Sequence, residues 1–220
     1  MNPAVRPSLA LVSSALLLCT PALAYDTPLS EQAVREAYFL GQRRDDSTAA
    51  FLNKYTKFLP PPKSGPHIDS VTFLTPFALL VQYSSHQSNY SAQQAALDHK
   101  AQDETVEISI DILLTQSYGP FVAKPTHSRS GSSMGIQPRS PGFWRAIKFR
   151  ILDGKEEVIT DDVTGEPNYA NCGEAGCELS GATVHIRFPA VAFTSDTTTI
   201  EITPPEGEAV SVDFDLTSLR

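Results

Sequence analysis

The sequence predicts a mainly β protein: an immunoglobulin-like antiparallel β-sandwich with an N-terminal helical segment and one inserted helix. Apolar and polar residues alternate in five segments, residues 105–114, 145–152, 183–188, 198–203 and 209–216. Clusters of Gly, Pro, Asp and Ser, which are typical of turns, separate several of these segments. A strand with one apolar face needs a second layer to cover that face, so we expect two antiparallel sheets packed face to face.

The first 24 residues predict a secretory signal peptide. Arg6 precedes an apolar run over residues 9–18, and Ala-Leu-Ala follows at residues 22–24. A charged start, an apolar stretch and small residues at the cleavage site appear in this order in such leaders. We therefore expect export to the periplasm or the cell exterior, with cleavage near Ala24.

Residues 25–62 predict a helical N-terminal segment followed by a proline-rich connector, and residues 63–220 predict the sandwich domain. Ser30 is a good N-cap for a first helix, which we expect Gly41 to end. A second helix is expected from Ser47 to about residue 59, where three consecutive prolines stop it.

Two stretches interrupt the predicted strands. Ser91 and Gln94 have capping-box spacing, which favours one inserted helix from about Ala92 to Gln102. Residues 124–142 are rich in Ser, Gly and Pro, and we expect a long loop there.

The cysteines Cys172 and Cys177 predict a disulfide that closes a hairpin loop. A structural zinc site needs four ligands, commonly from two such cysteine pairs, and only one pair is present. The spacing also differs from that of a thioredoxin-type redox motif. An exported chain meets an oxidising compartment, which favours disulfide formation.

A serine-hydrolase motif is the sharpest sign of an enzyme. Residues 131–135 match G-x-S-x-G around Ser133, and Asp161 and His185 follow in the chain order of a catalytic triad. This motif needs a buried strand before the serine and a helix after it. The flanking residues favour neither, so we expect a loop that matches the pattern by chance.

Metal and sugar chemistry have weaker signals. His99 with Asp103, and His67 with Asp69, could each supply two metal ligands, whereas a site needs three or four. Outward carboxylates such as Glu107 could serve a glycosidase, but the wet face of a sandwich carries such groups for solubility. We therefore expect no metal, no cofactor and no catalytic pair.

The loop at residues 124–142 and the residues just after it form the expected contact surface. Loops on rigid scaffolds carry much of protein recognition. We expect Arg129, Arg139, Phe143 and Trp144 to take part, with a core position as the alternative for Trp144.

Charge and hydropathy narrow the possible partners. The processed chain, residues 25–220, has 16 Lys and Arg against 25 Asp and Glu, a formal charge of −9. Such a chain repels nucleic acids, and no later segment approaches the roughly 20 apolar residues of a membrane span. The leading hypothesis is an exported, non-catalytic binding or scaffolding protein of the cell envelope with a protein partner. The alternatives are a secreted serine hydrolase using Ser133 and a metal-binding secreted protein.

Overall fold

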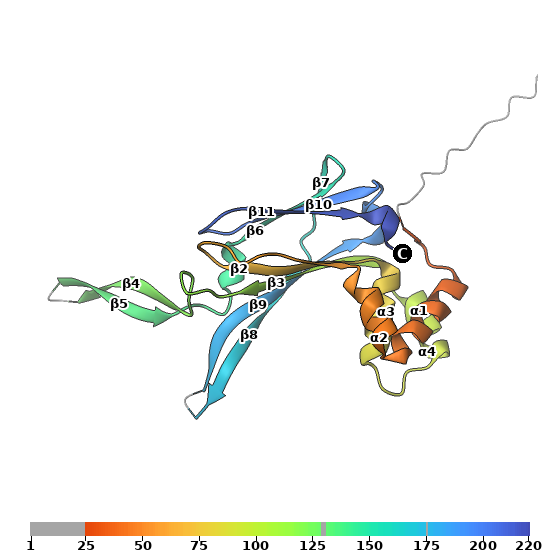
Figure 1. Cartoon of the computed structure of the whole chain (residues 1–220), viewed down its shortest axis with the longest axis horizontal. Helices are drawn as coiled ribbons and strands as arrows, with labels where there is room; N and C mark the ends of the chain where they lie inside the picture. Colours follow the sequence, from red (N-terminus) through yellow and green to blue (C-terminus); the bar gives the residue numbers. More distant parts are fainter. Residues whose placement is uncertain (1–24, 129–130, 175) are drawn as a thin grey trace, which may run out of the picture.

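The structure is a computed structural model that describes residues 25–128, 131–174 and 176–220. It confirms a mainly β chain with antiparallel sheets, since 41% of the residues are in strands and 28% in helices. Two sheets lie one above the other, helices gather at one end of the molecule, and a hairpin projects from the other end (Figure 1). The predicted signal peptide, residues 1–24, and Arg129 lie outside the described residues.

The two main sheets are built from strands that are mixed along the chain. The five-stranded sheet contains, in spatial order, β1 (Thr56–Phe58), β2 (His67–Leu74), β3 (Thr105–Leu113), β9 (Gly176–Pro189) and β8 (Val163–Gly173). The four-stranded sheet contains β11 (Val210–Asp215), β10 (Thr197–Thr203), β6 (Lys148–Asp153) and β7 (Glu156–Val158). Every neighbouring pair in both sheets is antiparallel.

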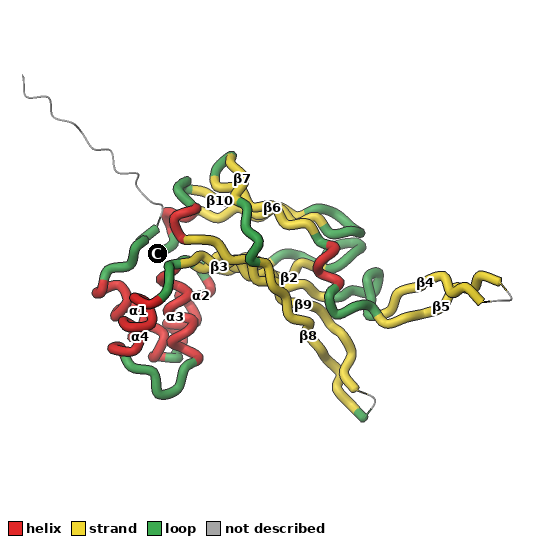
Figure 2. Tube along the Cα trace, turned by 180° about the vertical axis from the view of Figure 1, so that it is seen from behind, coloured by secondary structure: helices red, strands yellow, loops and turns green. Residues whose placement is uncertain are grey.

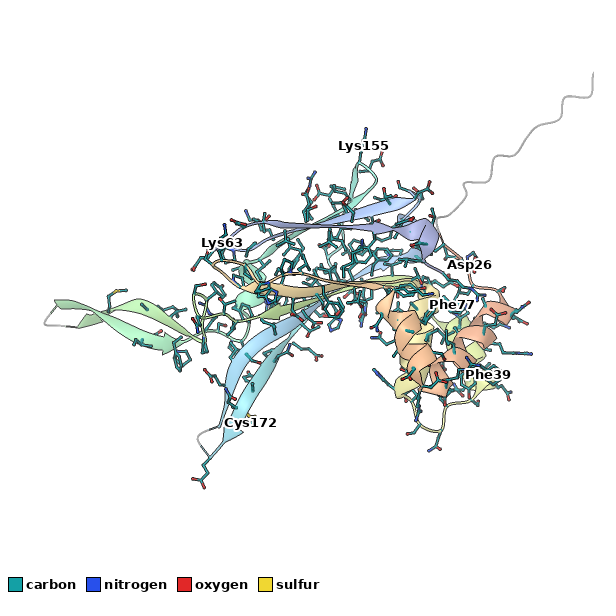
Figure 3. All side chains as sticks on the ribbon, in the orientation of Figure 1. Asp26, Phe39, Lys63, Phe77, Lys155 and Cys172 are labelled. Carbon is teal, nitrogen blue, oxygen red and sulfur yellow. A yellow bond between two sulfur atoms is a disulfide. The ribbon has the colours of Figure 1, made fainter. Side chains whose placement is uncertain are left out.

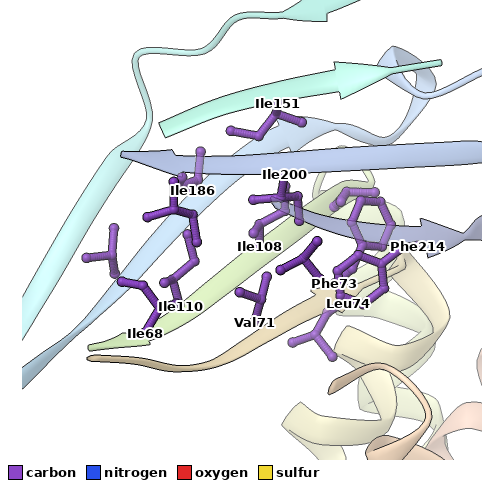
Figure 4. Close-up of a cluster of buried hydrophobic side chains, with 14 of the residues drawn as sticks. Ile68, Val71, Phe73, Leu74, Ile108, Ile110, Ile151, Ile186, Ile200 and Phe214 are labelled. Atoms are coloured by element: carbon purple, nitrogen blue, oxygen red, sulfur yellow. The ribbon is translucent and has the colours of Figure 1, made fainter. Parts of the chain in front are cut away.

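The core fills the space between the two sheets. Alternation in β3 places Val106, Ile108, Ile110 and Ile112 inward, and all four are fully buried. They meet apolar side chains from β2, β9, β10 and β11 (Figure 4). The alternating segments of the sequence thus correspond to strands that each cover one side of this core.

Four helices form a separate layer at one end of the sheets (Figure 2). They are α1 (Glu31–Arg43), α2 (Asp46–Asn53), α3 (Pro76–His86) and α4 (Ala92–Ala101). The inserted helix predicted from Ala92 is α4, and Ser91 caps it by accepting a 3.1 Å hydrogen bond from the Gln94 backbone N–H. The expectation of a single inserted helix is wrong, because α3 is a second helix between β2 and β3.

The N-terminal segment differs from its prediction in two details. Ser30 caps α1 by accepting a hydrogen bond from the Ala33 backbone N–H, as predicted. Gly41 does not end α1; a Cβ atom there would lie 2.3 Å from the Val81 carbonyl oxygen, so the glycine permits close packing of α1 on α3. The second helix is also shorter than expected, because β1 follows it and pairs with β2 across the division predicted at residue 62.

The loop predicted over residues 124–142 is largely a β-hairpin. It consists of β4 (Phe121–Ser128) and β5 (Gly131–Pro138), which pair in antiparallel register. The Ser, Gly and Pro residues that favoured a loop are compatible with this ribbon because both strands are edge strands.

The second projecting hairpin, formed by β8 and β9, carries the disulfide. Cys172 and Cys177 are joined by an S–S bond of 2.04 Å near the tip of this hairpin, as predicted (Figure 3). The longest helix in the described part of the chain, α1, has 13 residues, and no helix there is long and apolar enough to cross a membrane.

Candidate functional site

The β4–β5 hairpin projects from the body of the protein (Figure 1). Within the described residues its strands pair only with each other, and the hairpin extends away from both main sheets (Figure 1). Residues directly opposite each other in an antiparallel pair share one face of the ribbon. The register therefore sorts the side chains of the hairpin into two faces.

One face of this ribbon is apolar and open to water. We name it the apolar ribbon face; it consists of Phe121, Ala123, Met134, Ile136 and Pro138. Phe121 pairs with Pro138, and Ala123 pairs with Ile136. The exposed fractions are 58% for Phe121, 69% for Met134 and 79% for Ile136. Contiguous exposed apolar side chains of this kind mark interaction surfaces in soluble proteins.

The hairpin also lies in the longest run of the sequence without an acidic residue. Residues 112–152 contain six Lys or Arg and no Asp or Glu. The rest of the chain contains 11 Lys or Arg against 25 Asp or Glu. The positive charge of Lys124, on an exposed side chain of β4, is therefore not offset by any acid of its own segment.

Arg139 holds the root of the hairpin instead of projecting to a partner. Its Nε donates a 2.7 Å hydrogen bond to the Gly119 carbonyl, and its guanidinium lies 3.5 Å from the ring centre of Tyr118. Its backbone N–H also donates to the Pro120 carbonyl at 2.6 Å. These three contacts fix where β5 leaves the body of the protein.

Phe143 and Trp144 are buried, which corrects their prediction as a contact surface. Each is 6% exposed and belongs to the main core. A Cβ atom on Gly165 would lie 2.4 Å from the Trp144 ring, so the indole packs directly on the backbone of β8. The core alternative given for Trp144 is the one observed, because a short 3₁₀ turn over residues 143–146 points both rings inward.

The residues of the predicted catalytic set lie on different elements. Ser133 lies within β5, where its Cα pairs with that of Thr126, and not in a turn between a strand and a helix. His185 lies on β9, and its Nδ1 is 2.9 Å from a Glu107 carboxylate oxygen. The backbone of Ser133 thus lacks the setting of a nucleophile elbow.

The predicted metal pairs have other partners. His99 Nε2 lies 3.1 Å from Glu104, and His67 Nε2 lies 3.0 Å from the Leu59 carbonyl oxygen. His67 Nδ1 is 3.9 Å from Asp69. Among the residues that the structure describes, no three His, Cys, Asp or Glu side chains gather where they could hold a metal ion.

Glu107 forms a polar junction between β3 and β9. It is 8% exposed and accepts hydrogen bonds from His185 at 2.9 Å and from Arg187 Nε at 2.7 Å. The bond from His185, helped by Arg187 and opposed by burial, holds the pKa of Glu107 below its ordinary value. The same bond raises the pKa of His185. Glu107 is buried more deeply than the sequence predicted, since the alternation of β3 placed it on the outward, wet face.

A second surface, which the sequence did not indicate, is a groove at the helical end. Its volume is about 810 Å³. It is lined by residues between 27 and 34, by α4, and by residues 102–105, Thr160, Asp162 and residues 187–191. Its apolar lining residues are Pro28, Leu29, Val34, Ala96, Phe188, Pro189, Ala190 and Val191. Acidic side chains also border it, and we name it the acid-rimmed groove.

The rim of this groove has an excess of negative charge. Glu31, Asp103, Glu104 and Asp162 line it together with two cationic side chains, Lys100 and Arg187. Both cations are already paired with carboxylates, Lys100 with Glu31 at 2.8 Å and Arg187 with Glu107 at 2.7 Å. Asp103 and Asp162 are exposed and form no ion pair with any residue in the described part of the chain.

Comparison with known proteins assigns this chain to no family. No family model matches the chain, and no curated protein shows a significant match. The apolar ribbon face and the acid-rimmed groove are therefore the features of this chain that can indicate a function.

Proposed function

We propose that the chain is an exported, non-catalytic binding or scaffolding protein of the cell envelope, which contacts a protein partner through the apolar ribbon face. We also propose that its body is an immunoglobulin-like sandwich. The two antiparallel sheets, packed face to face, support this fold, which carries no function by itself.

The apolar ribbon face is the observation that carries this proposal. A two-stranded ribbon is at best marginally stable in water when nothing covers it. Ile136 and Met134 are more than two-thirds exposed, so this ribbon leaves its apolar side in water. Covering that side removes apolar area from water, which stabilises a complex.

Export rests on two features. Residues 1–24 have the order of charged, apolar and small residues typical of a leader. The Cys172–Cys177 disulfide suits an oxidising compartment such as the periplasm. Intact mass of the processed protein tests both, since it should begin at Tyr25 and be two hydrogens lighter than the reduced chain.

Site-specific photo-crosslinking in the producing cells tests the contact. A photoreactive residue at position 136 should give a discrete protein adduct, which the additional substitution Met134→Ser should weaken. Ile159 provides the matched control, because it is 82% exposed but lies outside the hairpin. No adduct at position 136, or an equal adduct at position 159, would contradict the proposal.

A serine-directed fluorophosphonate probe separates this proposal from the hydrolase alternative. We expect no labelling of the exported protein. Labelling that disappears in Ser133→Ala would replace the proposed binding role with catalysis.

A further inference from the structure

We propose that the helical end of the protein binds a linear polyamine, an aliphatic chain that carries several protonated amines. The acid-rimmed groove and a second hollow beside it form the site. This inference goes beyond the proposed function, because it uses neither the apolar ribbon face nor any other part of the β4–β5 hairpin.

The second hollow lies where the helical layer meets the five-stranded sheet (Figure 2). Its volume is about 490 Å³, and α3, α4, the segment after α4 and the adjoining ends of β3 and β9 line it. We name it the tyrosine pocket, after Tyr83 and Tyr90 in its lining. Each hollow has the size of a small-molecule site. The two are adjacent, because they share six lining residues: His99, Gln102, Asp103, Glu104, Thr105 and Arg187.

The walls of the two hollows suit the methylene chain of such a ligand. Tyr83 and Tyr90 have ring centres 5.4 Å apart and ring planes at 82°. Tyr83 is 50% exposed, and Val191 in the acid-rimmed groove is 67% exposed, so a ligand can cover apolar surface in each hollow. The face of a tyrosine ring also attracts a cation.

Three carboxylates of the site have no cationic partner in the described part of the chain: Asp98, Asp103 and Asp162. Asp98 accepts hydrogen bonds from two neutral groups, the Tyr90 hydroxyl at 3.0 Å and the Gln94 side-chain amide at 2.6 Å. Arg187 does not balance these charges, because its Nε lies 2.7 Å from Glu107. Both hollows therefore present unbalanced negative charge to a ligand.

The distribution of these carboxylates determines the class of ligand. Asp98 lines only the tyrosine pocket, Asp162 lines only the acid-rimmed groove, and Asp103 lines both. A metal ion needs three or four ligands around one point, and no such group gathers among the described residues. A polyamine places separate ammonium groups near separate carboxylates and lays its methylenes on the apolar walls. The formal charge of −9 on residues 25–220 also attracts cations to the protein.

Isothermal titration calorimetry of the processed protein with spermine, which has four amines, tests the inference. We expect saturable binding of one spermine per chain, which weakens at 0.5 M salt because charges are then screened over about 4 Å. Asp98→Asn and Asp162→Asn should each weaken binding about fivefold, as expected for one partly exposed ion pair. The double variant should weaken it about 25-fold, since the two positions lie in different hollows and act independently.

Asp213→Asn is the matched control for the loss of one carboxylate. Asp213 is exposed on β11 of the four-stranded sheet and lines neither hollow. Its substitution removes the same charge and should leave spermine binding unchanged. Urea unfolding of every variant, followed by Trp144 fluorescence, excludes loss of the fold as the cause.

Tyr83 tests the aromatic wall. Tyr83→Ala should weaken spermine binding about threefold, because it removes a ring face that attracts the cation. Tyr83→Phe keeps that face and should bind like the unaltered protein. Butylamine, which has a single amine, should bind at least tenfold more weakly than spermine and should not respond to both Asp98→Asn and Asp162→Asn.

Three results would overturn the inference: no saturable binding, equal weakening by Asp213→Asn, or butylamine that binds as tightly as spermine. A tetralysine peptide that binds more tightly than spermine would assign the site to a basic protein segment instead. The photo-crosslinking experiment at position 136 does not involve these two hollows. Failure of spermine to bind therefore leaves the proposed function intact, and absence of a crosslink leaves the polyamine site intact.

Discussion

Two hairpins project from this protein, and they are stabilised in different ways. β9 continues from its hairpin into the five-stranded sheet, where residues 181–189 pair with β3, and a disulfide joins the strands near the tip. β4 and β5 pair only with each other among the described strands and leave one apolar face in water. A projecting hairpin of the first kind is stable through its root and its crosslink. One of the second kind has neither support, and a two-stranded ribbon alone is at best marginally stable in water.

The largest expected effect is at the root of the β8–β9 hairpin. A Cβ atom at Gly181 would lie 2.1 Å from the Ile112 carbonyl oxygen, so Gly181→Ala must push β9 away from β3. We expect the free energy of unfolding to fall by about 3 kcal/mol, as in other overpacked cores. Urea unfolding measures this change.

Gly173→Ala is the control within the same hairpin. An added Cβ atom meets nothing within 4 Å there, so we expect a change of less than about 0.5 kcal/mol. Equal effects of the two substitutions would show that the root does not hold this hairpin.

Removal of the disulfide has the next largest effect. The double substitution Cys172→Ser, Cys177→Ser should lower the free energy of unfolding by about 2 kcal/mol, the value that chain entropy gives for so short a loop. Because β9 remains paired with β3, hydrogen exchange should accelerate at the tip and not in β3. Equal acceleration in β3 would contradict the idea that the root and the tip are stabilised separately.

The Glu107 junction predicts how the root responds to pH. The folded pKa of Glu107 lies below its ordinary value. Its contribution to the free energy of unfolding is therefore complete above about pH 4.5 and is lost as the pH falls through that lowered pKa. The folded pKa of His185 lies above its ordinary value, so its contribution to the free energy of unfolding is complete below about pH 6.5 and is lost as the pH rises through that raised pKa.

Glu107→Gln should therefore lower the free energy of unfolding most between about pH 4.5 and 6.5, and less on either side of that window. We expect a decrease of about 1 kcal/mol within the window, because the two donors, His185 and Arg187, are partly exposed to water. Urea unfolding of both proteins at several pH values measures the difference. A difference that does not depend on pH would show that the charge of Glu107 contributes nothing.

The smallest effect on the body is expected at the root of the β4–β5 hairpin. Arg139→Ala removes the hydrogen bond to Gly119 and the stacking on Tyr118. Hydrogen exchange in β4 and β5 should accelerate, while the free energy of unfolding of the body changes by less than about 1 kcal/mol. A larger loss for the body would show that the two hairpins are anchored alike.

The sequence predicts those parts of the fold that local patterns determine. The inward residues of β3 and the caps at Ser30 and Ser91 follow from local patterns, and the structure confirms them. The disulfide follows from spacing and compartment. These features depend on residues that lie close together in the chain.

The elements that the sequence does not predict depend on packing or on weak local preference. α3 follows β2 directly, and its buried apolar run resembles a further strand; the signals for a helix are the N-cap Thr75 and the proline at Pro76. β4 and β5 have the amino-acid composition of a loop, and they are strands only because they pair with each other.

The candidate site is predicted in part. The expected contact region at residues 124–142 overlaps the hairpin, but Phe143 and Trp144 lie in the core. The acid-free run over residues 112–152 is a charge signal that could have marked the region directly. The acid-rimmed groove brings together residues 27 to 191, so no local pattern could reveal it.

The position of β3 between β2 and β9 has a consequence for how the chain folds. Its pairs with β9 run from Leu113 with Gly181 to Thr105 with Pro189, so each joins residues far apart in the chain. Pairing of such distant strands is slow because a long loop must first close. Until β9 arrives, the isoleucine-rich edge of β3 can pair with other chains, so we expect aggregation of the incompletely folded protein to involve this strand.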